Sequence, residues 1–151
     1  DYTKAPFFAY GLGLQHKHLP EITRWSGLRR PPVFVPSVGR FNQGMIVQVP
    51  LQLWSLPDAP SLADVHAALA DHYRNSRFVK VPNLDETATI TRLQPDALNG
   101  TNELQLYVFG NNSNRQAVIA GVIDNLGKGA SGQAVQNMNI MLGRHESEGL
   151  P

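Results

Sequence analysis

The 151-residue sequence contains no cysteine. This absence excludes disulfide bonds, thiolate metal sites and a cysteine nucleophile within the chain. The sequence also lacks any apolar run close to the roughly 20 residues that a membrane-spanning helix needs. Its first ten residues, DYTKAPFFAY, lack the basic and apolar regions of a signal peptide. We therefore expect a cytoplasmic protein with no membrane partner. Because the chain starts at Asp1 rather than methionine, we expect a piece of a longer protein.

The sequence also has little excess charge of either sign. Its 13 Lys and Arg residues nearly balance its 12 Asp and Glu residues, which gives a formal net charge of +1. Because the charges balance and the basic residues are scattered along the sequence, we see no basic patch for nucleic acid and expect no nucleic-acid partner. At 42% hydrophobic and 17% charged residues it can bury a core. Its length predicts a single domain over residues 1–151.

The hydrophobic pattern predicts more strand than helix. Pro50 lies inside the clearest strand and indicates an edge position or a bulge, because proline cannot donate to a ladder. Ser61 and Asp64 resemble a capping box at the start of an amphipathic helix. Short turns between successive strands predict an α+β fold with a mainly antiparallel sheet and helices packed on one face. Strands are expected at residues 7–14, 33–35, 45–54, 77–81, 89–93, 104–109 and 116–123, and helices at 20–25, 61–73 and over about ten residues ending at Gly143.

Two histidines, His16 and His18, stand two positions apart and are followed by Glu21. In an extended backbone they would face the same side and could share one site. Histidine exchanges protons near neutral pH, and a carboxylate can orient an imidazole by accepting its ring N–H. The group therefore predicts acid/base chemistry, with a metal site or an ordinary surface feature as alternatives. Arg40 is available to hold an anionic substrate.

Residues 127–132 (GKGASG) match the G-x-G-x-x-G expression that begins many dinucleotide-binding helices. Such a fingerprint should begin a βαβ unit, but only one helix follows here. The milder interpretation is a turn whose amide groups favour an anion or allow another surface to approach closely. A tight strand-to-helix turn without a ligand is the remaining alternative.

Residues 123–142 (IDNLGKGASGQAVQNMNIML) resemble the C-terminal signature of N-acetyl-γ-glutamyl-phosphate reductases. Residues 16–22 (HKHLPEI) resemble the same family's H-x-H-x-P-E-I segment. Residues 33–38 (VFVPSV) and 98–104 (LNGTNEL) fall between them in the expected order. The resemblance covers nearly the whole chain, and it is closest to the shorter of the family's two sequence types.

This resemblance implies the C-terminal catalytic, substrate-binding and dimerisation domain of an arginine-biosynthesis oxidoreductase, with a fold like that of glyceraldehyde-3-phosphate dehydrogenase-like enzymes. The family reduces N-acetyl-L-glutamyl 5-phosphate with NADPH to N-acetyl-L-glutamate 5-semialdehyde and phosphate. Its cysteine nucleophile and the Rossmann domain that binds NADP are absent from this chain, so we expect the chain alone to be inactive. Partners implied are the acyl phosphate, the protein's own N-terminal domain and further copies in a dimer or tetramer.

The resemblance also implies roles for particular residues. His16 matches the acid/base histidine, whereas His18 and Glu21 match residues that line or brace the substrate site. Asn125, Lys128 and Gly129 match a turn near the nicotinamide side of the cofactor, and no metal is implied.

The family pattern is not matched everywhere. Many members carry an arginine directly before the glycine that Gly44 matches, but this chain has Gln43 there. Arg40 would then make the anion contact from a shifted position. Two alternatives are an aspartate-semialdehyde-dehydrogenase-like reductase domain and a stand-alone binding or dimerisation module. The length of the source gene would distinguish a stand-alone module from an enzyme domain. The enzyme interpretation requires the gene to encode roughly 150 further residues upstream, which is the length of a second domain.

Overall fold

The structure is a computed structural model that describes residues 4–151. The chain forms two compact units, Asp1–Asn42 and Gln43–Pro151. Each unit has its own secondary structure. The single domain expected over residues 1–151 stays a prediction.

The first unit contains two short antiparallel strands, β1 (Phe7–Ala9) and β2 (Ser37–Gly39). The strand predicted over residues 7–14 ends early, because the backbone turns at Gly11 and Leu14, where φ is 64° and 54°. The strand predicted at residues 33–35 is wrong. Prolines precede and follow that segment and have no N–H to donate to a ladder, so the strand forms after them instead.

Helix α1 (Leu19–Ser26) is the helix predicted at residues 20–25. Pro20 lies in its first turn, where a missing N–H costs nothing. Gly27 ends the helix with a φ of 70°, as its place in the sequence predicts.

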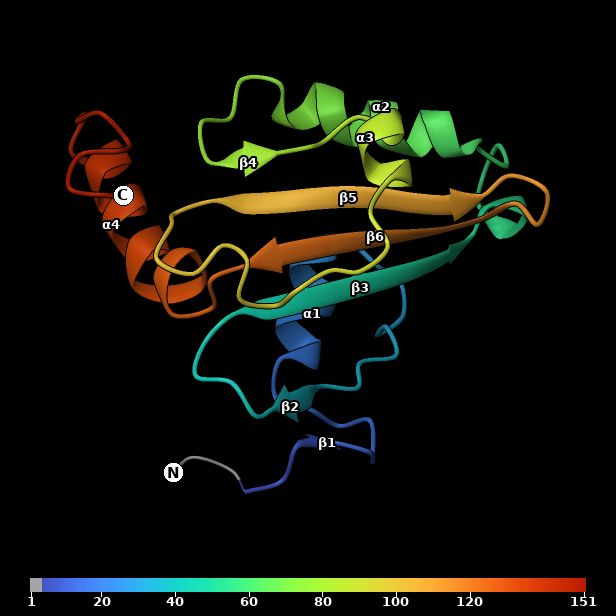
Figure 1. The fold of residues 1–151 in the computed structure, drawn as a ribbon, viewed down its shortest axis with the longest axis horizontal. Coiled ribbons are helices and arrows are strands. Elements are labelled where there is room, and N and C mark those ends of the chain that lie inside the picture. Colours follow the sequence, from blue (N-terminus) through green and yellow to red (C-terminus); the bar gives the residue numbers. More distant parts are fainter. Residues whose placement is uncertain (1–3) are drawn as a thin grey trace. The chain divides into compact units, whose positions relative to one another are not determined.

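The second unit is built on a four-stranded sheet (Figure 1). Its strand order is β3 (Met45–Gln52), β6 (Gln116–Ile123), β5 (Leu104–Asn111) and β4 (Val79–Lys80). The β3–β6 and β5–β6 pairs are antiparallel, and only the short β4 runs parallel to β5. The predicted α+β class with a mainly antiparallel sheet is therefore confirmed, and β3 lies at the edge as Pro50 indicated.

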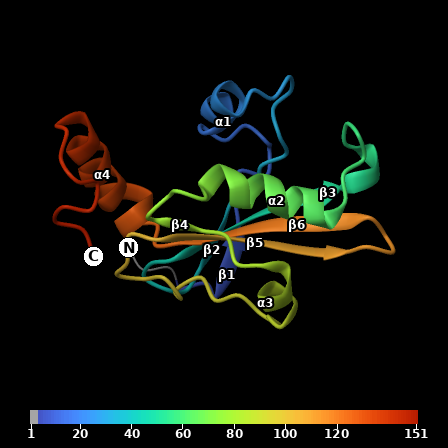
Figure 2. The same cartoon turned by 90° about the horizontal axis from the view of Figure 1, so that it is seen from above.

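Helix α2 (Leu62–Tyr73) covers one face of this sheet, and its predicted capping box between Ser61 and Asp64 is present. The packing is close, because a Cβ placed on Gly110 of β5 would lie 2.4 Å from Leu62. The short helix α3 (Leu84–Ala88) lies against the opposite face (Figure 2). It was not predicted, and the strand expected at residues 89–93 is wrong.

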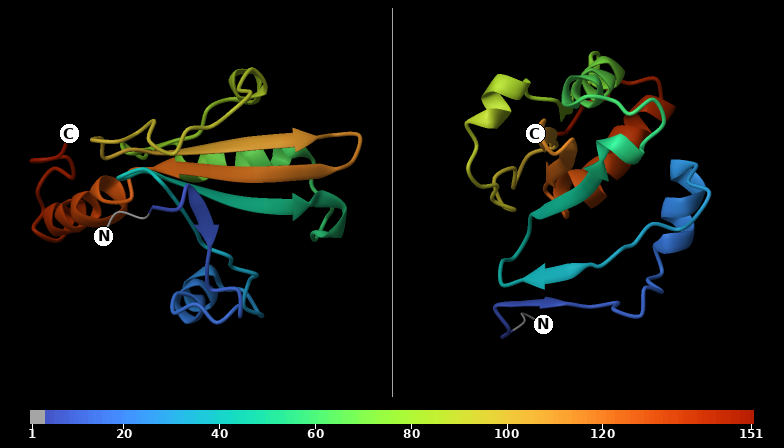
Figure 3. Two further views of the ribbon diagram at one scale, coloured as in Figure 1. Left: turned by 60° about the horizontal axis from the view of Figure 1, so that its bottom comes forward. Right: turned by 90° about the vertical axis from the view of Figure 1, so that its right-hand side faces the viewer.

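The core of the second unit lies between β5, β6 and the segments that cover them. Helix α4 (Gly132–Met141) extends from the end of the sheet opposite the 112–115 hairpin loop, as Figure 3 shows. Its exposed apolar side chains include Met138, Ile140 and Met141, and Leu142 directly after it is exposed as well. The buried apolar side chains of the unit are Leu53, Phe78, Leu98, Val108, Ala117, Ala120 and Val122.

Candidate functional site

The two histidines of the first unit meet at the start of α1. His18 is the N-cap of this helix and has helical backbone angles, so the backbone here is not extended. The turn still brings the imidazole rings together, with their centroids 4.7 Å apart. The backbone N–H of His18 donates to His16 Nδ1 at 3.3 Å. When His16 is neutral, its own proton therefore resides on Nε2.

Aromatic neighbours surround the half-buried ring of His16. Tyr10 lies 5.6 Å and Phe34 lies 5.1 Å from its centroid, both at steep angles. Edge contacts of this kind restrict how the ring can rotate. The imidazole is consequently held by its neighbours and by the His18 N–H, whereas His18 itself is exposed.

Glu21 and Arg40 lie in the same unit as the histidines. Glu21 is exposed in the first turn of α1, where the helix dipole favours a carboxylate. Within residues 4–151 it makes no hydrogen bond to His16 or His18. Arg40 follows β2 and is exposed, and its backbone N–H donates to the carbonyl of Pro6 at 3.1 Å.

Asp124 organises the turn that follows β6 in the second unit. The buried carboxylate accepts hydrogen bonds from the backbone N–H groups of Leu126 and Gly127 through one oxygen. The other oxygen accepts from the Gly100 N–H at 2.8 Å and from Gln43 Nε2 at 2.9 Å. The backbone N–H groups of Gly127 and Gly100 do most to lower the pKa of Asp124. Sequence reasoning missed Asp124, although an aspartate before a glycine-rich turn is a recognisable turn signal.

The predicted cofactor residues lie on this turn, residues 125–131. Asn125 is half-buried and its Oδ1 accepts from the Gly44 N–H at 2.7 Å. Its Nδ2 makes no hydrogen bond to the residues that the structure describes. Gly129 is exposed, and its N–H donates to the Asp124 carbonyl at 2.8 Å. The Lys128 side chain, by contrast, is buried within the unit.

Two glycines of the GKGASG segment, Gly127 and Gly132, are required by packing. Residues Gly127–Ser131 form a single π-helical turn that leads into α4. A Cβ at Gly132 would lie 2.3 Å from Asn102 Oδ1, which is too close for any other residue. This tight strand-to-helix turn explains the spacing without a dinucleotide fingerprint.

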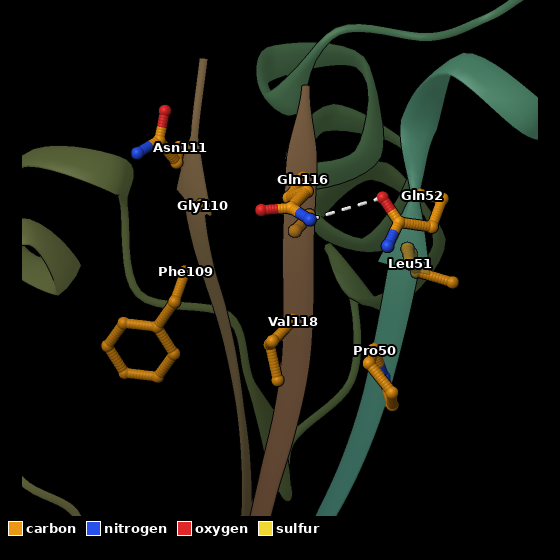
Figure 4. A pocket seen from close by; sticks show the side chains of 9 residues that line it. Pro50, Leu51, Gln52, Phe109, Gly110, Asn111, Gln116 and Val118 are labelled. Carbon is orange, nitrogen blue, oxygen red and sulfur yellow. Dashed lines mark hydrogen bonds between the residues drawn. The ribbon is translucent and has the colours of Figure 1, made fainter. Parts of the chain in front are cut away.

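Two of the hollows in the second unit lie near the ends of its sheet. One, of about 280 Å³, lies beside the 125–131 turn and is lined by Asn102, Asp124, Ser131 and Leu150 among others. The other, of about 570 Å³, lies toward the hairpin end of the sheet. There the side chains of Pro50, Val118 and Phe109 stand in one row across three strands (Figure 4).

Residues 4–151 contain no group of three His, Cys, Asp or Glu side chains placed to hold a metal ion. No helix in this range is long and apolar enough to cross a bilayer.

Comparison with known proteins adds a family likeness. A family model described as the semialdehyde dehydrogenase dimerisation domain matches residues 2–125. The chain is 52% identical over 144 residues to an N-acetyl-gamma-glutamyl-phosphate reductase of Brucella ovis, and these cover 95% of the chain. It is 49% identical over 148 residues to N-acetyl-gamma-glutamyl-phosphate reductase 2 of a Nostoc species, at 96% coverage. In both cases the chain spans 46% of the relative's length.

Proposed function

Because the chain belongs to the semialdehyde dehydrogenase dimerisation-domain family, we propose that it is the C-terminal part of an NADP-dependent N-acetyl-γ-glutamyl-phosphate reductase. The whole protein reduces N-acetyl-L-glutamyl 5-phosphate with NADPH to the 5-semialdehyde and phosphate, a step of arginine biosynthesis in the cytoplasm. The observation that carries this proposal is identity of about 50% to two such reductases across nearly the entire chain. The part of the relatives outside this chain would contain the nucleophilic cysteine and the Rossmann domain.

His16 is the acid/base residue in this proposal. Its Nδ1 accepts the His18 N–H, so Nε2 is the nitrogen left to exchange a proton with a reacting group. The His16 imidazole takes a proton from the cysteine thiol that attacks the substrate. It later gives a proton to the oxygen on the carbon that was attacked. The rings of Tyr10 and Phe34 hold the imidazole in place, which keeps the distance to the reacting atoms constant.

His18, Glu21 and Arg40 bind the substrate in this proposal. Arg40 supplies a positive charge for an anionic group of the acyl phosphate, since a guanidinium can donate two parallel hydrogen bonds. Glu21 and His18 lie at the start of α1, and the ring of His18 contacts that of His16.

The 125–131 turn is proposed to face the cofactor. Asn125 Nδ2 is a donor without a partner among the described residues, and the exposed Gly129 allows close approach. Both features fit a cofactor rich in oxygen acceptors. When bound, NADPH supplies the reducing equivalents for the reaction. Asn125 would donate to it, and Asp124 would hold Asn125 in place through the backbone.

Replacing His16 by asparagine in the full-length protein tests this assignment. We expect kcat to fall roughly 100-fold or more, the range typical of a lost general acid/base. The matched control is His72→Asn, because His72 is an exposed histidine on α2, outside the proposed site. Thermal unfolding should be unchanged in both variants. Equal rates for wild type and His16→Asn would remove His16 from this role.

The family description leaves a second substrate open. Semialdehyde dehydrogenases give the family its name, so an aspartyl-phosphate reductase is the competing function. Assays of the full-length protein with both acyl phosphates separate the two. Faster turnover of aspartyl phosphate would replace the proposed substrate.

A further inference from the structure

Lys128 is buried, unlike the other lysines of the chain. Only 6% of Lys128 is exposed, whereas Lys4, Lys17 and Lys80 are exposed. Its Nζ donates to Gln133 Oε1 at 2.7 Å and to Gln136 Oε1. It also lies 5.4 Å from the centre of the Phe78 ring. The ammonium therefore faces the interior of the second unit, although Lys128 stands between two glycines of an exposed turn.

Gln136 connects this buried cation to the segment after α4. The side chain of Gln136 is itself buried, and its Nε2 donates to Glu146 Oε2 at 2.8 Å. Asn139 adds to this connection, because its Nδ2 donates to the main-chain carbonyl of Glu148 at 2.8 Å. A chain of hydrogen bonds thus runs from the turn through α4 to residues 146–148.

The charges along this chain of hydrogen bonds are opposite in sign. Burial lowers the pKa of Lys128, and the nearby carboxylate of Glu146 opposes that shift. A buried ammonium is tolerated only when acceptors and an opposite charge compensate for its lost hydration. Here the glutamine oxygens are the acceptors and Glu146 is the opposite charge. The lysine and its acceptors consequently depend on one another.

We propose that Lys128 is a positioning residue: its ammonium fixes the 125–131 turn against α4 and residues 146–148, and it acts on the cofactor only through that turn. The part of this proposal that concerns the cofactor rests on the proposed function. Asn125 and Gly129 are then the groups that face the cofactor, and Lys128 determines where their backbone lies.

The test uses the full-length protein with Lys128→Met and Gln136→Met, singly and together. Both substitutions remove the hydrogen bonds of the side chain; methionine matches glutamine in length and is one atom shorter than lysine. Amide hydrogen exchange of residues 125–131 is measured with and without NADPH, together with kcat and the two KM values. Lys80→Met is the matched control, because Lys80 is an exposed lysine on β4.

Each single variant should accelerate exchange in residues 125–131 roughly 10-fold and raise the KM for NADPH, with little change in the KM for the acyl phosphate. The double variant should be no worse than the more severe single one, because both substitutions break the same set of hydrogen bonds. The proposal would be overturned if Lys128→Met raised the KM for NADPH while Gln136→Met changed neither the exchange of residues 125–131 nor that KM. That result would mean that Lys128 contacts the cofactor directly.

Glu146→Gln keeps the test decisive if Lys128→Met does not fold. It leaves Lys128 in place and removes only the opposite charge, so a smaller acceleration of exchange in the same segment is expected. If residues 125–131 of Glu146→Gln exchanged their amide hydrogens at the wild-type rate, the proposal would be refuted. A wild-type protein without activity toward the acyl phosphate would refute the proposed function instead, and the exchange rates without NADPH would still decide the role of Lys128.

Discussion

Replacing Asp124 by asparagine should destabilise the second unit strongly. The carboxylate is 1% exposed and accepts hydrogen bonds from Gln43, Gly100, Leu126 and Gly127. An asparagine side chain has one oxygen, and its NH₂ group would face two N–H donors. Because each of the two donors left unpaired costs about 1–3 kcal/mol, the loss should total about 2–6 kcal/mol. For a chain of this size, that corresponds to a fall of roughly 4–24 °C in Tm.

The pH dependence of this loss follows from the pKa of Asp124. Its hydrogen bonds hold the pKa below the ordinary value of 3.8. The stability that the carboxylate contributes is therefore fully present above that value and is lost as the pH falls toward the lowered pKa of the folded state. The difference in stability between wild type and Asp124→Asn should be constant from about pH 5 to pH 8 and should shrink at more acidic pH.

Thermal unfolding followed by circular dichroism, repeated over this pH range, measures both effects. Asp71→Asn is the matched control, because Asp71 is an exposed aspartate of α2 and its replacement should change stability by less than about 0.5 kcal/mol. If Asp124→Asn unfolded at the same temperature as the wild type, this assignment of the hydrogen bonds would be refuted. A difference that grows toward acidic pH would refute the direction of the pKa shift.

Two further predictions concern the backbone near the turn and the open sheet. Gly44→Ala should cost at least about 2 kcal/mol, because Gly44 has a φ of 105° and an added Cβ would lie 2.2 Å from the Pro95 carbonyl oxygen. Gly100→Ala, at a φ of 76° with open space around it, should cost less in the same unfolding assay, and equal losses would exclude the clash as the cause. Val118→Lys in the full-length protein should shift sedimentation from a dimer or tetramer toward a smaller species. The family is a dimerisation domain, and Val118 lies between Pro50 and Phe109 on the face opposite α2. Asn112→Lys in the exposed hairpin loop is its control, and an unchanged sedimentation coefficient for Val118→Lys would place the contact elsewhere.

Local patterns predicted the elements that depend on neighbouring residues. Alternating apolar residues predicted β3, and two apolar segments separated by hairpin-loop residues predicted β5 and β6. The Ser61–Asp64 capping box predicted the start of α2. The same kind of signal was overlooked once. Asn83 and Glu86 form a capping box at the start of α3, in a segment that looked irregular.

The sequence by itself determined the family and the candidate residues, because the HKHLPEI and IDNLGKGASGQ segments are contiguous and specific. It could not determine what those side chains face. His16 and His18 do lie together, but a helical turn brings them together and not an extended backbone. Asp124 and Lys128 acquire their roles from residues that are distant in sequence or on another segment, such as Gln43 and Glu146. Burial and hydrogen-bond partners depend on the whole chain, so only the tertiary structure shows Asp124 as the centre of the turn and the Lys128 ammonium facing inward.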